Sequence, residues 1–266
     1  MVLQDDLNKL ANWANDWKMK LNHDKCKIMS ISVKSYDVNR PFALIDLKNG
    51  VSHDLEETAS ERDLGVQVTN NLKWSEQAKK ASNNATRVLA ILRKAFVFWD
   101  IATTKRLYTT FVRPHLEYAA TVWNPYAKKD IKLLERVQQR VTKLPASVRN
   151  QSYEERLKIF NLTTLQEKRE RGDAIQLYKF NRGFNIINWH HPVGQTYRGN
   201  TDGPANSVRG LNQRLSSQLT RVKQREHFFS NRCVRIWNNT PEETWRAKSI
   251  NGFKNAYDKY TKTKLL

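Results

Sequence analysis

The chain has few of the residues that mark several classes of protein. Only two of its 266 residues are cysteine, Cys26 and Cys233, which excludes a disulfide framework and favours a reducing compartment. The longest uncharged apolar run, residues 95–99, is far too short to cross a bilayer, and the N-terminus shows no signal-peptide core. The nine glycines lack the spacing of a phosphate loop. We therefore expect an intracellular protein, nuclear or cytoplasmic, with no membrane partner.

Acidic residues are also scarce relative to basic ones. The chain has 26 Asp and Glu against 46 Lys and Arg, which gives a formal net charge of +20. The excess lies in residues 75–182 (+12) and 205–266 (+9), whereas residues 1–74 carry −1. Cations clustered in this way favour a polyanionic partner, of which nucleic acid is the commonest. A hydrophobic fraction of 39% is sufficient for a folded core.

The hydrophobic pattern predicts an α+β fold that is mostly α-helical. Residues 3–21 repeat apolar side chains at helical spacing, and residues 28–33, 42–47 and 64–68 are typical of short strands in a small antiparallel sheet. Helices are expected from Ser75 to about residue 95, over 102–123 and from Asp130, and Pro114 should end or kink the second of these near Arg113. Capping boxes predict two further helix starts, at Ser152 with Glu155 and at Thr164 with Glu167.

Composition divides the chain into four segments. Residues 1–74 form a helix on a small sheet, and residues 75–182 form a helical bundle. Residues 183–210 hold five of the nine glycines and are expected to be a linker. Residues 211–266 form a small basic helical subdomain, in which Pro241 stops one helix and Ser249 caps the last.

Residue patterns that would carry catalysis are missing, whereas binding signals are present. No Cys or His pair has zinc-ligand spacing, and Asp5-Asp6 is best explained as the acidic first turn of a helix, so we expect no metal site. Basic residues alternate with aromatic ones, and cations bind phosphates while aromatic rings stack on bases. Trp123, Phe229 and Trp237 lie on apolar stripes and are expected in the core. For Arg221, Arg225 and Arg232, phosphate contact and plain solvation both remain open.

Short motifs in one order resemble a single family across nearly the whole chain. These are LQDDL at 3–7, LNHDKC at 21–26, DLGV at 63–66, VRPHLEY at 112–118, VWNP at 122–125, LERVQ at 134–138, YEERL at 153–157, GD at 172–173, REHFF at 225–229 and WN at 237–238. Together they resemble the LINE-type reverse transcriptases of jockey-like non-LTR retrotransposons.

The resemblance implies the C-terminal part of an RNA-directed DNA polymerase. Residues 1–74 would be the end of the palm, with a primer-grip hairpin at Leu64 and Gly65. Residues 75–182 would be the helical thumb, and residues 211–266 a small C-terminal region. Lys25 would match the palm lysine that assists the leaving pyrophosphate in an intact enzyme. The expected partner is an RNA–DNA hybrid or duplex, bound without sequence preference through Arg106, Arg113, Arg136, Arg140, Lys168, Arg169, Arg221, Arg225, Arg232 and Arg235.

One departure from the family limits the expected activity. The family's metal-binding aspartates have no match in this chain and would lie before Met1. Nucleotidyl transfer needs Mg²⁺ held by carboxylates, so we expect this chain to bind no cofactor and to be inactive alone. From the residues alone, Lys25 is an ordinary exposed lysine and Gly65 a strand bulge. Two alternatives remain: a domesticated non-enzymatic binding or interaction module, or a fragment that complements an upstream fingers–palm polypeptide.

Overall fold

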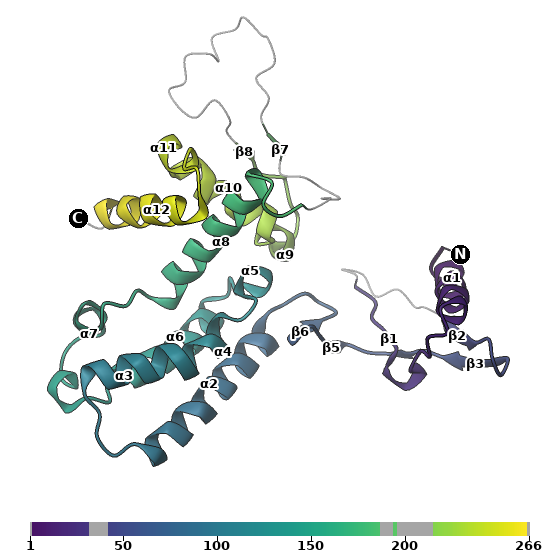
Figure 1. Ribbon diagram of the computed structural model, residues 1–266, viewed down its shortest axis with the longest axis horizontal. Helices are drawn as coiled ribbons and strands as arrows, with labels where there is room; N and C mark the ends of the chain where they lie inside the picture. The colour runs from purple at the N-terminus through teal and green to yellow at the C-terminus, as the bar shows by residue number, and fades with distance from the viewer. Residues whose placement is uncertain (1, 32–41, 187–193, 196–214, 265–266) are drawn as a thin grey trace, which may run out of the picture. The chain divides into compact units, whose positions relative to one another are not determined.

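The structure is a computed structural model that describes residues 2–31, 42–186, 194–195 and 215–264 (Figure 1). It has the α+β, mostly helical fold that the sequence predicts. Backbone contacts divide the chain into two compact units, residues 1–76 and residues 77–266. Each unit is described by itself below.

The first unit begins with helix α1 (Val2–Asp16), which packs on a hairpin of β2 (Ala43–Asp46) and β3 (Val51–Asp54). The Gln4 side chain donates to the Ala43 carbonyl (2.8 Å) and accepts from the Ala43 amide (3.1 Å). Ala11, Ala14 and Leu44 are buried. The helix stops at Asp16, short of the predicted end near Asn22, and the next turn contains Lys18 at a positive φ of 56°. A left-handed residue cannot continue a right-handed helix.

The strands of this unit form separate pairs, whereas the sequence predicted one antiparallel sheet. A 3₁₀ turn at His23–Lys25 leads into β1 (Lys27–Ile28), which pairs in parallel with β4 (Glu56–Glu57). The antiparallel pair of β5 (Ser60–Asp63) and β6 (Val66–Thr69) follows. The third strand therefore begins two residues later than predicted. Residues 32–41, which include the end of the predicted first strand, lie outside the described residues.

The second unit contains the predicted long helices. Helix α2 (Ser75–Ala95) begins at Ser75, and Ala78, Ala81 and Ala85 on its expected apolar stripe are buried. The predicted helix over 102–123 is instead divided into α3 (Ile101–Leu107), a π-helical turn η2 (Tyr108–Val112), α4 (Arg113–Glu117) and α5 (Ala120–Trp123). Pro114 lies in the first turn of α4, where its missing N–H is not needed.

The next elements are α6 (Lys128–Thr142), a short 3₁₀ helix η3 (Ala146–Val148), α7 (Tyr153–Phe160) and α8 (Leu165–Asn181). Both predicted capping boxes are present. The Ser152 hydroxyl accepts the Glu155 amide and the Glu155 carboxylate accepts the Ser152 amide, and Thr164 with Glu167 repeats this pattern. Because each capping box satisfies two of the orphan amides at its helix start, both starts are fixed locally.

The last elements share a core with α8. They are the strand pair β7 (Gly194–Gln195) and β8 (Leu215–Ser216), followed by α9 (Lys223–Glu226), α10 (Phe229–Asn239), α11 (Glu242–Trp245) and α12 (Ile250–Lys264). Helices α10 and α12 pack on α8 (Figure 1). Tyr178 of α8 stacks on Phe253 (4.4 Å between ring centroids), and Trp245 stacks on Trp237 (4.3 Å). The predicted linker, 183–210, falls largely outside the described residues.

Candidate nucleic-acid interface

Five cations form a stripe along the exposed side of α6. They follow one another at intervals of three and four residues, which places them on one face of a helix, and all five are exposed: Lys129, Lys132, Arg136, Arg140 and Lys143. At 1.5 Å per residue the stripe is about 21 Å long. Among the described residues, no carboxylate lies within ion-pairing distance of any of them. We call these residues the α6 stripe.

The acidic side chains of α6 face the interior and leave the α6 stripe uncompensated. Asp130 is buried. The Glu135 carboxylate accepts the Leu165 amide (3.0 Å) and the Tyr153 hydroxyl, and Gln138 donates to the same hydroxyl (2.8 Å). Burial raises the pKa of Glu135 above its usual range. This network joins α6 to the starts of α7 and α8, and it holds the basic face outward.

A groove of about 440 Å³ lies between the end of the α6 stripe and the start of α7. Four of the residues that line it are cations and none is a carboxylate. The lining consists of Arg136, Gln139, Arg140, Lys143, Gln151, Ser152, Tyr153 and Arg156. Arg156 differs from the other cations because it is 3% exposed. Its Nε donates to Thr142 Oγ1 (3.2 Å) and its Nη1 to the Gln151 carbonyl, while its guanidinium lies 5.6 Å from the Tyr153 ring centroid.

The predicted cations of 75–182 occupy different environments. Arg106, Arg136 and Arg140 are exposed. Arg113 pairs with Glu117 (3.5 Å), and partial burial lowers the pKa of Lys168. Arg169 is buried, donates to the Leu165 and Leu116 carbonyls, and lies over the Trp123 ring at 5.6 Å. Because its guanidinium is engaged inside the protein, we leave Arg169 out of the interface.

The four predicted cations of the last segment divide in the same way. Arg221 and Arg235 are exposed, whereas Arg225 donates to Gln218 and lies over the Phe228 ring. Arg232 makes a two-bond salt bridge to the Asp173 carboxylate, at 2.8 Å for both contacts. It also donates to the Thr121 and His227 carbonyls. Two interpretations were left open for Arg232, phosphate contact and plain solvation, and the structure shows neither. The Arg232 guanidinium instead links α10 to α8 and α5.

The core predictions for the aromatic residues are confirmed. Trp123, Phe229 and Trp237 are all buried. The Trp123 indole donates to the Tyr118 carbonyl at 2.6 Å, so its polar N–H is satisfied. These rings therefore stabilise the fold and are not available to stack on bases.

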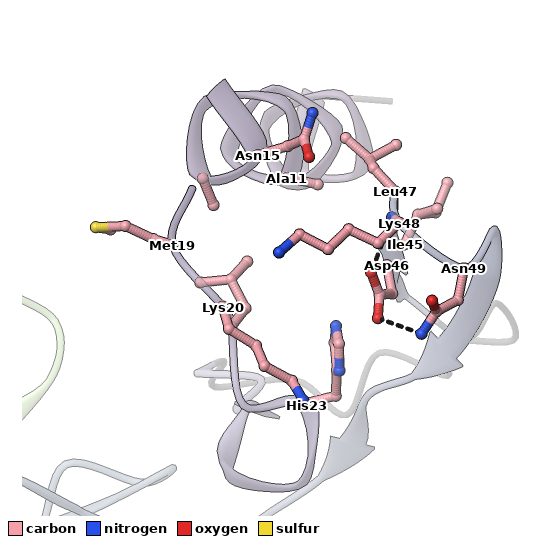
Figure 2. Close-up of a pocket in the computed structure, with 12 residues that line it drawn as sticks. Ala11, Asn15, Met19, Lys20, His23, Ile45, Asp46, Leu47, Lys48 and Asn49 are labelled. Atoms are coloured by element: carbon pink, nitrogen blue, oxygen red, sulfur yellow. Dashed lines mark hydrogen bonds between the residues drawn. The ribbon is translucent and has the colours of Figure 1, made fainter. Parts of the chain in front are cut away.

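In the first unit, Lys25 is exposed and its backbone amide is capped by the Asn22 side chain (3.3 Å). Near it, a pocket of about 250 Å³ lies between the end of α1 and the β2–β3 hairpin. Figure 2 shows the His23 and Lys48 side chains pointing into this pocket, while the Asp46 carboxylate accepts from Asn49 (3.1 Å). Lys25 is not one of the residues that line it. The pocket therefore does not assemble around the predicted catalytic lysine.

Leu64 and Gly65 form the two-residue turn of the β5–β6 hairpin. Both have positive φ, 43° and 87°, as the favoured tight hairpin turn requires. Leu64 is 85% exposed at the tip. The residues that match the primer grip are thus at a projecting turn, and Gly65 is a turn glycine, not a strand bulge.

Neither a cluster of metal ligands nor a membrane-spanning helix occurs among the described residues. Within the described residues, no group of three or more His, Cys, Asp or Glu side chains is arranged to hold a metal ion. Asp5 and Asp6 are exposed on α1, and Asp6 pairs with Lys9 (3.1 Å). In the part of the chain that the structure describes, Asp5 and Asp6 therefore do not fit the paired-metal site of a polymerase. No helix in the described segments is long and apolar enough to span a membrane.

Sequence reasoning named Arg136 and Arg140 but missed the rest of this interface. Lys129, Lys132 and Lys143 could have been found, because their spacing from those arginines is helical. Arg156 carried no such signal, since its position depends on how α7 folds back against the end of α6.

Comparison with known proteins gives one distant relative. The chain is 33% identical over 115 residues to an uncharacterized protein of Caenorhabditis elegans, a match that covers 40% of this chain and 56% of that protein. The chain thus spans about half the length of the curated relative that it matches. No protein-family profile and no solved structure matches the chain.

Proposed function

We propose that this chain is a C-terminal fragment of a non-LTR retrotransposon reverse transcriptase, and that it holds a nucleic-acid duplex by its phosphate backbone. The α6 stripe is the observation that carries the binding proposal. Its five cations, none of which pairs with a carboxylate of the described residues, occupy about 21 Å of one helix face, a length comparable to two-thirds of a turn of duplex. Contacts of this kind neutralise phosphates and release counterions, so binding is tolerant of sequence and sensitive to salt.

The ancestry part of the proposal rests on the motifs and their order. Several of these motifs supply residues of one contact region in the second unit. Asn124 of the VWNP motif donates to Asp173 (3.1 Å), and Tyr126 stacks on His227 of the REHFF motif (4.6 Å). Pairs 49 and 101 residues apart in the sequence are expected to be kept only if both partners belong to one fold unit. In the alternative, the apolar helix faces of residues 75–145 would pack against the helices of a partner protein. This alternative has less support, because Ala78, Ala81 and Ala85 are already buried within the chain.

A charge-reversal experiment tests the binding proposal. Arg136→Glu/Arg140→Glu should weaken binding to a fluorescent RNA–DNA hybrid and flatten its dependence on salt. Because each lost phosphate contact reduces the slope of log K against log[salt] by about 0.9, the slope should fall by about 2. The matched control is Lys259→Glu/Lys262→Glu, two exposed cations on α12 that receive the same change in charge. Equal losses in both variants would show that net charge alone drives binding and would contradict the proposal.

A further inference from the structure

We propose that the groove between α6 and the start of α7 binds a single phosphate group, with Arg156 as its fixed anchor. This inference rests on the proposed function, since it names the part of the nucleic acid that the groove takes. The α6 stripe would bind neighbouring phosphates loosely, whereas the groove would fix the position of one of them.

Arg156 is held in place before any ligand arrives. Two of its donors are already engaged, Nε by Thr142 and Nη1 by the Gln151 carbonyl, and its face lies over Tyr153. Its Nη2 has no hydrogen-bond partner among the described residues. This atom is also absent from the side-chain atoms of those residues that are fully buried without a partner, so it is accessible from outside. Nη2 is therefore open to the groove that Arg156 lines. A guanidinium that is already oriented loses little entropy when it donates to an anionic oxygen.

The rest of the groove suits an anion. Arg136, Arg140 and Lys143 are exposed and can move toward a ligand beside Arg156. With no carboxylate in the lining, the four cations give it a formal charge of +4. The Ser152 and Glu155 amides at the start of α7 do not contribute, because the capping box already uses both of them. Side-chain cations therefore carry the recognition.

The size of the groove limits what it can hold. At about 440 Å³ it accommodates a phosphate with its attached sugar but not a duplex. The phosphate can come from two sources, an internal diester of a strand or a terminal monoester, and both present two oxygens to a guanidinium.

The test uses the full, ¹⁵N-labelled chain and inorganic phosphate as the probe, with chloride adjusted to hold ionic strength constant. We expect saturable NMR shifts at the Gln151 and Ser152 amides and at Arg156 Nε. Arg156→Lys keeps the charge but loses Nη2 and the fixed, planar guanidinium, and should weaken phosphate binding at least ten-fold. Two 12-base-pair duplexes, with and without a 5′-phosphate, then distinguish the sources. If both reproduce the shifts, the site takes an internal diester, and if only the phosphorylated duplex does so, it takes a terminal phosphate.

A second variant protects the test against misfolding. Arg140→Gln/Lys143→Gln changes two exposed side chains. It should weaken phosphate binding at least three-fold, while the midpoint of thermal unfolding stays unchanged. Shifts that rise linearly without saturation, or that neither variant alters, would overturn the site. A chain that binds duplex at low salt without these saturable shifts contradicts the groove alone. A chain that binds no duplex contradicts the proposed function.

Discussion

Removal of the Arg232 side chain should destabilise the protein without affecting the salt dependence of nucleic-acid binding. Arg232 and Asp173 form a salt bridge with two 2.8 Å contacts, and their side chains are 11% and 2% exposed. Arg232→Ala would leave the Asp173 carboxylate buried without its main partner. The Thr121 and His227 carbonyls would lose a donor in the same step.

The size of the effect follows from this burial. Breaking a buried ion pair by removing one partner costs about 3–5 kcal/mol, because the remaining charge stays desolvated. We therefore expect Arg232→Ala to lower the free energy of unfolding by about 4 kcal/mol. Asp173→Ala should cost a similar amount. The double variant should cost less than the sum of the two, with a coupling energy of about 2 kcal/mol or more, since each single change already breaks the same contact.

Urea unfolding followed by tryptophan fluorescence measures these differences. Arg235→Ala is the matched control, because Arg235 is an exposed arginine on the same helix. It should change stability by no more than about 0.5 kcal/mol. If Arg232→Ala is as stable as the wild type and instead reduces the salt dependence of duplex binding, Arg232 is a phosphate contact and this reasoning is refuted.

Three further results are expected. Ser152→Ala should lower the free energy of unfolding by about 1 kcal/mol, because the hydroxyl that caps α7 is lost. An unchanged stability in urea unfolding would show that the cap contributes nothing. Burial raises the pKa of Glu135 above its ordinary value of 4.5, so the native state holds this proton more tightly than the unfolded chain; the associated stability is present below pH 4.5 and is lost as the pH rises through the folded-state pKa. Glu135→Gln should therefore gain stability relative to the wild type as the pH rises from 4.5 to about 7, and a constant difference between their urea midpoints would contradict the assignment. In a primer-extension assay with Mg²⁺ or Mn²⁺, this chain alone should give no templated product, and synthesis by the purified chain would show that the metal-binding aspartates of the family are not needed.

Local signals in the sequence predicted part of this structure well. The starts of α7 and α8 are encoded by the capping boxes at Ser152 and Thr164, within one turn of each helix, so no tertiary information was needed. The burial of Trp123 and Trp237 likewise follows from apolar spacing on a helix.

Features that depend on distant partners were not predictable in the same way. The parallel pairing of β1 with β4 joins residues 29 positions apart, and nothing in either two-residue strand specifies its partner. Arg232 and Asp173 are 59 residues apart, and in sequence Arg232 is indistinguishable from an exposed cation. In the candidate site, Arg136 and Arg140 were found because they are basic residues of the segment that resembles a thumb. Arg156 was not, because its role depends on contacts with Thr142 and Gln151.

The salt dependence of duplex binding tests the central claim most directly. Fluorescence anisotropy of an end-labelled RNA–DNA hybrid should be measured with the wild-type chain between about 50 and 200 mM salt. With five phosphate contacts along the α6 stripe, log K should fall linearly with log[salt] with a slope of about −4.5. A flat response, or no binding at the lowest salt, would contradict the account.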